Sequence, residues 1–326
     1  MLTNKFFLTS SSLILSMFFI MMCTESIYIK WLMMEFSTII SIGLINIDSG
    51  NKKISILYYI MSTISGLFVI IVVSMNFSFL MIKDIMINNI LMISMFLKLG
   101  IFPFWFWMIY IYNIATWPQI FLLSTIMKFI PIYFFSDVIY MSMNMFGFIC
   151  LNNLLISMYA NYKFNMKKLL GCSSIFNSSY LLLMLYMNNS LFILLSVIYL
   201  INFAFLIYMM SYYNISNMEF NYVPENVMNL IKIMMFTYSS FPMFSTFIFK
   251  WEFFMLLSSF NMNNNMVMMI LISNVVMIWN YFIVVKYMNL KFETMLPKIE
   301  LNSPYISMMI LMIFAYSFTF LLYNII

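Results

Sequence analysis

The sequence predicts an all-α integral membrane protein with about eleven transmembrane helices. Its 326 residues are 65% hydrophobic and 8% charged, whereas about 25% of the residues of a soluble domain are charged. Apolar runs of about 20 residues recur along the chain, and a helix of that length crosses the hydrocarbon core of a bilayer. The strands of a membrane barrel would show alternating patterns of about ten residues. These observations favour a bundle of membrane-spanning helices.

Five of the predicted spans lie in the N-terminal half. No small-residue cleavage site follows the first apolar run, so we predict a helix there and not a signal peptide. The five spans are residues 6–22, 27–47 and 54–75, then one segment around Lys98 and one around Lys128.

Six further spans are predicted in the C-terminal half, where a polar loop, residues 214–229, precedes the ninth span. The six spans are residues 141–159, 168–187, 191–213, 231–260, 266–285 and 305–326. We predict one polytopic membrane domain over residues 1–326, with five-helix units at 1–137 and 138–290 and a C-terminal helix within 291–326. Because five is an odd number of crossings, the second unit is predicted to be inverted relative to the first.

The lysines test this topology, because basic residues gather in the loops on the inner side of the membrane. Ten lysines fall on the side of the N terminus: Lys5, Lys52, Lys53, Lys163, Lys167, Lys168, Lys232, Lys286, Lys291 and Lys298. Only Lys30 and Lys83 fall on the opposite side. The asymmetry predicts an inner N terminus and an outer C terminus.

Three lysines remain, and each lies inside a predicted span: Lys98, Lys128 and Lys250. A charge at mid-span costs about 2.5 to 3.5 kcal/mol on insertion scales, so it normally faces a polar interior and marks an ion path. The alternative is a side chain that extends to the headgroups. A lysine stem covers about 6 Å, whereas mid-span is about 15 Å from the hydrocarbon edge. We therefore predict a proton-transfer role for the three lysines as a set.

Glu35, in the segment WLMMEFSTII, is the one acidic residue that we place well inside a span. It could be protonated and inert, it could pair with Lys30 nearer the helix end, or it could belong to the ion path.

Prolines lie close to the three buried lysines. Pro103 follows Lys98, Pro131 follows Lys128 and Pro242 precedes Lys250. Proline lacks an N–H and clashes with the preceding turn, so we predict bent or opened helices at these positions. Interrupted helices at the fourth position of two inverted units indicate a transport site near the middle of the bilayer.

Several classes of site have no support in the sequence. Histidine is absent, and Cys23, Cys150 and Cys172 stand alone without a C-x-x-C pair, so we predict no haem, zinc or iron–sulfur site. Every basic residue is lysine, and the 39 methionines accompany many residues with A/T-rich codons. We hypothesise an organellar gene, without an Arg-rich presequence; ordinary G/C content in the gene would contradict this.

Five segments, in order, resemble segments of the NADH dehydrogenase subunit 2 family, the antiporter-like subunits of mitochondrial respiratory complex I. They are WLMMEFSTII, LKLGIFPFWFW, IMKFIP, NMKKLLGCSSIFNSSY and SSFPMFSTFIFKWEFF. The resemblance covers essentially the whole chain. The chain departs from the family at Trp105 and Asn177, where histidine is usual or frequent, and at Ser239, Ser240 and Phe249, where glycine or proline is usual.

The resemblance implies a proton-translocating subunit in the mitochondrial inner membrane, with its N terminus in the matrix and its C terminus in the intermembrane space. Glu35 and Lys98 would form the coupled pair of one half-channel, Lys128 the central relay and Lys250 the link to the second half-channel. NADH, FMN, iron–sulfur clusters and ubiquinone would be bound by other subunits, so this chain would hold no catalytic redox site and no cofactor. Its partners would be the lipid bilayer and neighbouring antiporter-like subunits, with no nucleic acid.

Two other readings stay open. A free-standing cation/proton antiporter would bind its ion with carboxylates, yet only Glu35 is placed inside a span. A purely structural membrane scaffold has no use for three lysines at mid-span.

Overall fold

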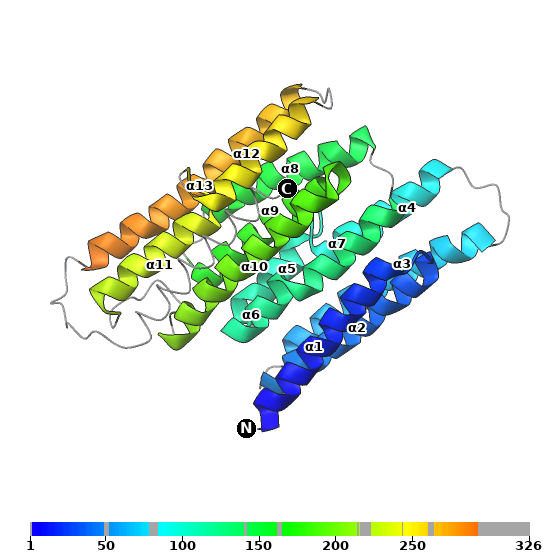
Figure 1. The fold of residues 1–326 in the computed structure, drawn as a ribbon, viewed down its shortest axis with the longest axis horizontal. Coiled ribbons are helices and arrows are strands. Elements are labelled where there is room, and N and C mark those ends of the chain that lie inside the picture. Colours follow the sequence, from blue (N-terminus) through cyan, green and yellow to red (C-terminus); the bar gives the residue numbers. More distant parts are fainter. Residues whose placement is uncertain are drawn as a thin grey trace. The chain divides into compact units, whose positions relative to one another are not determined.

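The computed structural model describes residues 2–48, 52–77, 84–139, 142–161, 165–213, 215, 223–242, 244–259 and 264–292. All regular structure within these ranges is α-helical (Figure 1). The helices are α1 (Leu2–Cys23), α2 (Ile27–Asp48), α3 (Lys53–Phe77), α4 (Asp84–Leu99), α5 (Trp105–Ile114), α6 (Trp117–Ser124), α7 (Ile126–Val138), α8 (Met143–Asn161), α9 (Met166–Met187), α10 (Asn189–Tyr212), α11 (Glu225–Tyr238), α12 (Ser245–Ser259) and α13 (Asn264–Phe292).

The helices confirm the predicted fold class. Among the described residues, seven stretches have the length and hydropathy of a membrane span: Ile27–Asn46, Lys53–Ser74, Trp117–Val138, Met143–Asn161, Met166–Met187, Asn189–Tyr212 and Asn264–Asn289. Three shorter apolar helices are Ser10–Cys23, Met86–Leu99 and Val227–Tyr238. The total of eleven spans stays a prediction, because the last one, residues 305–326, lies outside the described residues.

The chain forms two compact units. The first unit comprises Met1–Asn152 and Asn177–Leu182, and the second comprises Asn153–Phe176 and Leu183–Ile326. The predicted five-helix units, 1–137 and 138–290, and their inverted relationship stay predictions.

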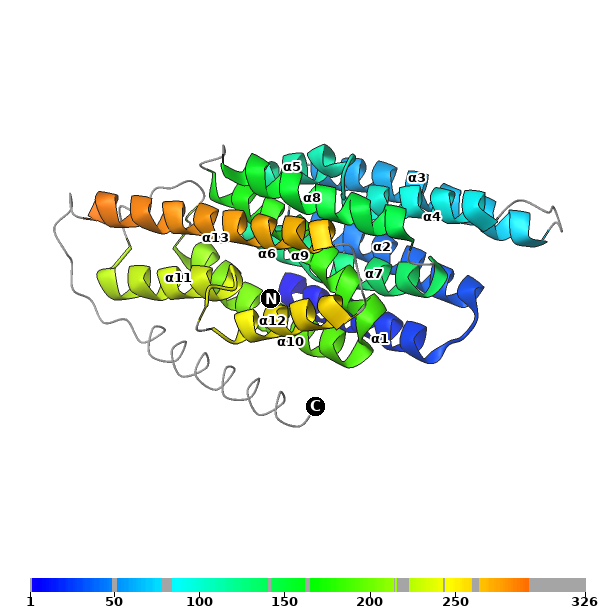
Figure 2. The ribbon, with the colours of Figure 1, turned by 90° about the horizontal axis from the view of Figure 1, so that it is seen from above.

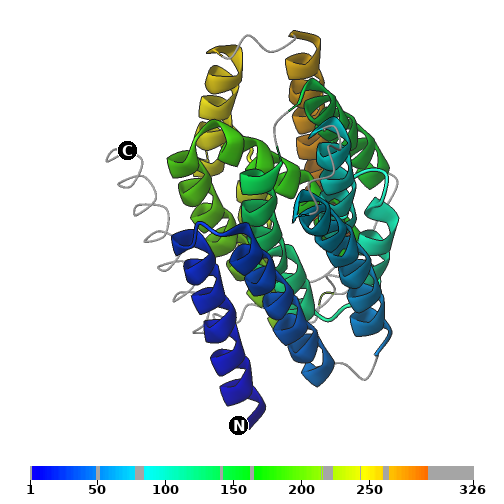
Figure 3. The ribbon, with the colours of Figure 1, turned by 90° about the vertical axis from the view of Figure 1, so that its right-hand side faces the viewer.

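In the first unit, α1, α2 and α3 lie side by side (Figures 1 and 3). α2 packs against α1, α3 and α7, while α4 packs against α3 and α7. Thus α7 contacts both α2 and α4, the helices that carry Glu35 and Lys98. The first unit therefore brings together the helices of three of the four predicted site residues.

The span that contains Lys98 is interrupted between α4 and α5. α4 ends at Leu99, and Pro103 lies in the segment before α5. Gly100 has a φ of +66°, and a Cβ at this position would lie 2.9 Å from the Cβ of Met108. Only glycine adopts this left-handed backbone easily and leaves room for Met108. Glycine and proline together thus end the helix directly after Lys98.

The interruption of the next span is not where the sequence predicted it. We expected a break beyond Lys128 at Pro131, but α7 continues through Pro131, and the break lies before Lys128, at Thr125. Thr125 ends α6 with its backbone N–H donating to the carbonyl of Phe121, and its own carbonyl accepts from the N–H groups of Lys128 and Phe129. Pro131 removes one intrahelical hydrogen bond, which a buried membrane helix tolerates.

In the second unit, α10 packs against α11 and α12, and α13 also packs against α11 and α12. The span that contains Lys250 is interrupted between α11 and α12, which follow one another in the same general direction (Figures 1 and 2). Ser240 has a φ of +59°, and Pro242 lies two residues later. The hydroxyl of Thr246, in α12, donates to the carbonyl of Thr237, near the end of α11, at 2.6 Å. A side chain thus satisfies one of the carbonyls that the broken helix leaves free.

Candidate functional site

An ion pair lies at the centre of the first unit. The Nζ of Lys98 is 2.7 Å from the Oε1 of Glu35, with side-chain exposures of 1% for the lysine and 22% for the glutamate. Lys98 belongs to the last turn of α4, where the free carbonyls of a helix end favour a cation. Of the partners open to Glu35 from the sequence, the structure selects Lys98 and not Lys30.

Gly66, on α3, makes room for the carboxylate. A Cβ at Gly66 would lie 3.0 Å from the Oε1 of Glu35, the oxygen that faces Lys98. The role of Gly66 could not be predicted, because nothing in the sequence of α3 indicates which neighbouring side chain a small residue makes room for.

Lys30 has a different partner, which the sequence does not reveal. Its Nζ lies 2.5 Å from the Oδ2 of Asp137, at the C-terminal end of α7. The same ammonium lies 5.7 Å from the centre of the Tyr133 ring, within the range of a cation–π interaction. α2 therefore carries two charges of opposite sign, Lys30 and Glu35, and each has a compensating partner on another helix.

A cavity of about 520 Å³ adjoins this second ion pair within the first unit. Most of its walls are apolar, and its polar side chains are Asn88 and Asp137. Its lining residues are Ile27, Val69, Val72, Val73, Ile87, Asn88, Leu91, Phe134, Asp137 and Val138. The lining belongs to the ends of α2, α3, α4 and α7 that the predicted topology assigns to the outer side of the membrane.

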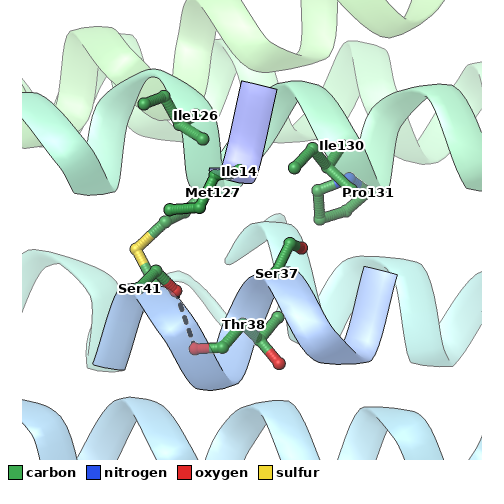
Figure 4. Close-up of a pocket in the computed structure, with 8 residues that line it drawn as sticks. All are labelled: Ile14, Ser37, Thr38, Ser41, Ile126, Met127, Ile130 and Pro131. Atoms are coloured by element: carbon green, nitrogen blue, oxygen red, sulfur yellow. Dashed lines mark hydrogen bonds between the residues drawn. The ribbon is translucent and has the colours of Figure 1, made fainter. Parts of the chain in front are cut away.

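Lys128 lies on α7 with 2% exposure, three residues beyond the interruption at Thr125. The residues beside it line a small cavity between α7 and α2 (Figure 4). Met127 and Pro131 of α7 face Ser37 and Ser41 of α2 across this cavity (Figure 4). Its volume of about 10 Å³ is close to the least space that one water molecule needs.

Three hydroxyls line that cavity from α2. Ser37, Thr38 and Ser41 donate to the carbonyls of Met34, Glu35 and Thr38, at 2.7 Å in each case. Each hydroxyl oxygen can still accept a hydrogen bond. Since Pro131 has no N–H to offer the carbonyl of Met127, that oxygen is a further acceptor on the α7 side. The polar lining thus lies between the helix of Glu35 and the helix of Lys128.

Lys250 lies in the second unit, on α12, beyond the interruption between α11 and α12. Its Nζ is 3.5 Å from the Oδ1 of Asn274, on α13, and 5.4 Å from the centre of the Phe176 ring, on α9. An amide oxygen and an aromatic face both attract a cation. Lys250 therefore lies next to two groups that attract its ammonium.

Glu252 corrects the statement that Glu35 is the one acidic residue inside a span. It lies near the middle of α12, within the predicted ninth span, and its Oε2 is buried with no hydrogen-bond partner among the described residues. The sequence already indicated that Glu252 is inside a span, because it lies two positions after Lys250 in the predicted ninth span. A buried carboxylate oxygen without a partner is costly, which makes Glu252 a residue to test.

The structure thus brings Glu35 and Lys98 into direct contact, places Lys128 on a helix that packs against both of theirs, and places Lys250 in the other unit. No group of three or more His, Cys, Asp or Glu side chains that could hold a metal ion occurs in the part of the chain that the structure describes. Fold and site together define a polytopic α-helical membrane protein that carries ionisable side chains inside interrupted spans.

Comparison with known proteins identifies the family. The chain is 40% identical over 281 residues to "NADH-ubiquinone oxidoreductase chain 2" of Apis mellifera ligustica, and the match covers 85% of this chain and 84% of that protein. The chain therefore belongs to the NADH-ubiquinone oxidoreductase chain 2 family. It matches no protein-family model.

Solved structures share the fold. A chain of "Respiratory complex I from Thermus thermophilus with bound Aureothin" matches with a TM-score of 0.73 and 13% identity, over 91% of this chain and 73% of that one. A chain of the membrane-bound sulfane sulfur reductase, an archaeal respiratory membrane complex, matches with a TM-score of 0.72 and 16% identity, over 91% of this chain and 70% of that one. A chain of the Mrp complex from Dietzia sp. matches with a TM-score of 0.62 and 13% identity, over 79% of this chain and 56% of that one.

Proposed function

We propose that this chain is the proton-translocating, antiporter-like subunit of an NADH:ubiquinone oxidoreductase. The observation that carries the proposal is the ion pair between Glu35 and Lys98, which lie 2.7 Å apart inside the membrane-spanning part of the first unit. Transfer of one proton from the ammonium to the carboxylate neutralises both groups. The pair can therefore hold a proton in either of two forms without leaving an isolated charge in the membrane. Membership in the NADH-ubiquinone oxidoreductase chain 2 family supports this assignment.

Lys128 is the central relay in this proposal, and Lys250 connects the path to a second half-channel. Pro103, Pro131 and Pro242 lie near the path. Pro131 is inside α7 and has no N–H for the carbonyl of Met127, which leaves that oxygen to bind water. The reaction of NADH with ubiquinone takes place in other subunits, which hold FMN and the iron–sulfur clusters. This chain is a core subunit that contributes no redox group.

The same proposal places the chain in the mitochondrial inner membrane, with its N terminus in the matrix and its C terminus in the intermembrane space. Its partners are other subunits of the membrane arm, including further antiporter-like chains. The ten-to-two distribution of the lysines outside the spans supports this orientation.

The first experiment removes the ammonium of the ion pair. Lys98→Met keeps the apolar stem and removes the titratable group, so NADH-driven proton pumping by the assembled complex in proteoliposomes should be lost. Lys286→Met is the control, because Lys286 is an exposed lysine near the C-terminal end of α13. Full pumping by the Lys98 variant, at normal levels of assembled complex, would refute the proposal.

A second experiment tests whether Lys128 is a relay or only a structural charge. Lys128→Met removes the charge, whereas Lys128→Arg keeps it but cannot release a proton, since the pKa of arginine is above about 12. A relay fails with both substitutions, while a structural cation tolerates arginine. Full pumping by the Arg variant would remove Lys128 from the path.

A free-standing cation/proton antiporter is the second candidate, because interrupted spans that carry ionisable side chains are also typical of transporters. Such a protein would hold its ion with carboxylates, but Glu35 is already paired with Lys98. Extraction in mild detergent separates the two candidates. A subunit of the oxidoreductase migrates within an assembly much larger than its own 38.9 kDa, whereas a free antiporter migrates alone.

A further inference from the structure

A cluster of buried hydroxyl groups lies in the second unit, apart from the residues discussed so far. It consists of Ser173 on α9, Tyr199 on α10, Tyr238 on α11 and Tyr281 on α13. The hydroxyl of Ser173 is within hydrogen-bond distance of the hydroxyl of Tyr238, at 3.3 Å, and the hydroxyls of Tyr238 and Tyr199 are 3.2 Å apart. The rings of Tyr238 and Tyr281 are 6.0 Å apart and nearly perpendicular. Four helices thus converge on one group of hydroxyls.

Tyr281 indicates that the cluster binds something besides protein. Its side chain has no exposed surface, and its hydroxyl interacts with the hydroxyl of Ser173 without forming a well-aligned hydrogen bond to any described residue. Buried hydroxyls are almost always hydrogen-bonded, either to protein or to an ordered water molecule. A ring without the hydroxyl would fill the same space, so packing alone does not account for tyrosine here. The chemistry of the site favours a bound water next to Tyr281.

The position of the cluster relates it to Lys250. On α9, Ser173 lies one helical turn before Phe176, whose ring is 5.4 Å from the Nζ of Lys250. On α13, Tyr281 lies seven residues after Asn274, which accepts a hydrogen bond from Lys250. At 1.5 Å per residue this separation is about 10 Å along the helix axis. The cluster is therefore within two helical turns of Lys250 on both helices.

On α9 and on α13, the residue of the cluster lies on the same side of the residue that contacts Lys250. Ser173 lies toward the start of α9, which carries Lys167 and Lys168, and Tyr281 lies toward the end of α13, which carries Lys286 and Lys291. These lysines belong to the lysine-rich side of the membrane in the predicted topology. The hydroxyls thus lie between the lysine-rich side and Lys250, within the second unit.

We propose that the hydroxyl cluster of Ser173, Tyr199, Tyr238 and Tyr281 delivers protons from the lysine-rich side of the membrane to Lys250. This inference rests on the proposed proton-translocating function. A hydroxyl can accept one hydrogen bond while it donates another. A proton that binds to one oxygen releases the hydrogen already there to the next oxygen, and rotation of the hydroxyls restores the starting arrangement. At the end of the transfer every hydroxyl is neutral again, and the neutral amine of Lys250 has become an ammonium. Bound water joins Tyr281 to the chain and spans the remaining distance to Lys250.

The test uses Tyr→Phe substitutions, which remove the hydroxyl and keep the ring. In the assembled complex in proteoliposomes, Tyr281→Phe and Tyr238→Phe should each lower the rate of NADH-driven proton pumping by about tenfold or more, as expected for the loss of a group that transfers a proton. Tyr208→Phe is the matched control, since Tyr208 is an exposed residue of α10 outside the cluster. Lys250→Met is the reference for a blocked path.

Tyr281→Phe separates proton delivery from a structural role. The Tyr281 hydroxyl makes no well-aligned hydrogen bond to a described protein group, only the interaction with Ser173, so its removal should leave assembly and thermal stability nearly unchanged while pumping falls. Normal pumping by both tyrosine variants beside an inactive Lys250→Met would overturn this inference and leave the proposed function in place. A loss of pumping that only follows a loss of assembled complex would also overturn it. Normal pumping by Lys250→Met would instead count against the role proposed for Lys250 itself.

Discussion

Each unit carries a lysine in an interrupted span and a glutamate inside a predicted span, but the two units compensate the carboxylate differently. In the first unit, Glu35 lies 2.7 Å from the ammonium of Lys98, and the two residues come from different helices. In the second unit, Glu252 and Lys250 share α12, and the Oε2 of Glu252 has no partner among the described residues. Residues two positions apart on a helix point to different sides, so they cannot meet as Glu35 and Lys98 do. A carboxylate inside a span therefore finds its cation across helices and not along one helix.

The interruptions of the two units also differ in the type of residue that adopts a left-handed backbone conformation. Each contains one residue in the left-handed region of backbone conformation, Gly100 with a φ of +66° in the first unit and Ser240 with a φ of +59° in the second. Glycine adopts this conformation without a steric penalty, whereas serine pays one. The first unit thus has the residue that the backbone requires, and the second tolerates strain at the same kind of position.

The largest expected effect comes from breaking the ion pair of the first unit. Lys98→Met leaves the charge of Glu35 inside the protein without its partner. We expect the free energy of unfolding to fall by about 3 kcal/mol, the low end for a broken buried pair, because Glu35 retains some exposure. The double variant Glu35→Gln/Lys98→Met should recover most of this loss and still fail to pump. Thermal denaturation of the complex in detergent measures the first effect, and equal stability of the single and double variants would contradict it.

The next effect concerns the interruptions. Gly100→Ala places a Cβ 2.9 Å from the Cβ of Met108 and forces an L-residue into the left-handed region. We expect it to destabilise the chain by about 2 kcal/mol. Ser240→Gly relieves the corresponding strain in the second unit and should stabilise it by up to about 1 kcal/mol. The thermal midpoint should fall for Gly100→Ala and rise for Ser240→Gly, relative to the unchanged chain. Changes in the same direction would remove this distinction between the units.

A smaller effect is expected from the space that Gly66 leaves for Glu35. Gly66→Ala adds a Cβ about 3.0 Å from the Oε1 of Glu35, so the carboxylate must shift relative to Lys98. We expect a partial loss of pumping with little change in assembly. Gly43→Ala, on α2, is the matched control, since no atom lies within 4 Å of its added Cβ. This control should be neutral or stabilise the helix by up to about 1 kcal/mol. Equal pumping by the two variants would show that the contact with Gly66 does not position Glu35.

The smallest effect is expected at Glu252. Glu252→Gln replaces the carboxyl by a neutral group of the same shape, and because its Oε2 makes no hydrogen bond to a described residue, the change in stability should stay within about 0.5 kcal/mol. Pumping should persist, in contrast to a Glu35→Gln variant, which should lose it. A Glu252 variant that assembles normally but does not pump would add this residue to the proton path of the second unit.

The sequence predicted much of the fold and part of the site. The all-α membrane class follows from apolar runs of about 20 residues, the length of a helix that crosses a bilayer, and the structure confirms it. The interruption after Lys98 lies close to Pro103, as predicted, because proline acts on its own backbone, while the part played by Gly100 became visible only in the structure. The interruption near Lys128 was predicted at Pro131 but lies before Lys128, at Thr125, since a proline in the first turns of a helix breaks too few hydrogen bonds to end it. Glu252 was overlooked although its position in the ninth span was visible.

The sequence by itself determined the properties that depend on one residue and its neighbours along the chain. These properties are the length and hydropathy of each span, the lysines that lie inside spans and not in loops, and the residues that end a helix. Only the tertiary structure decided which charges meet. Glu35 pairs with Lys98 across 63 positions of the chain and Lys30 with Asp137 across 107, and the hydroxyls of Ser173, Tyr199 and Tyr238 meet from three helices. Such pairs depend on how helices pack against one another, and the near-uniform apolar surface of a membrane helix does not encode which face meets which neighbour.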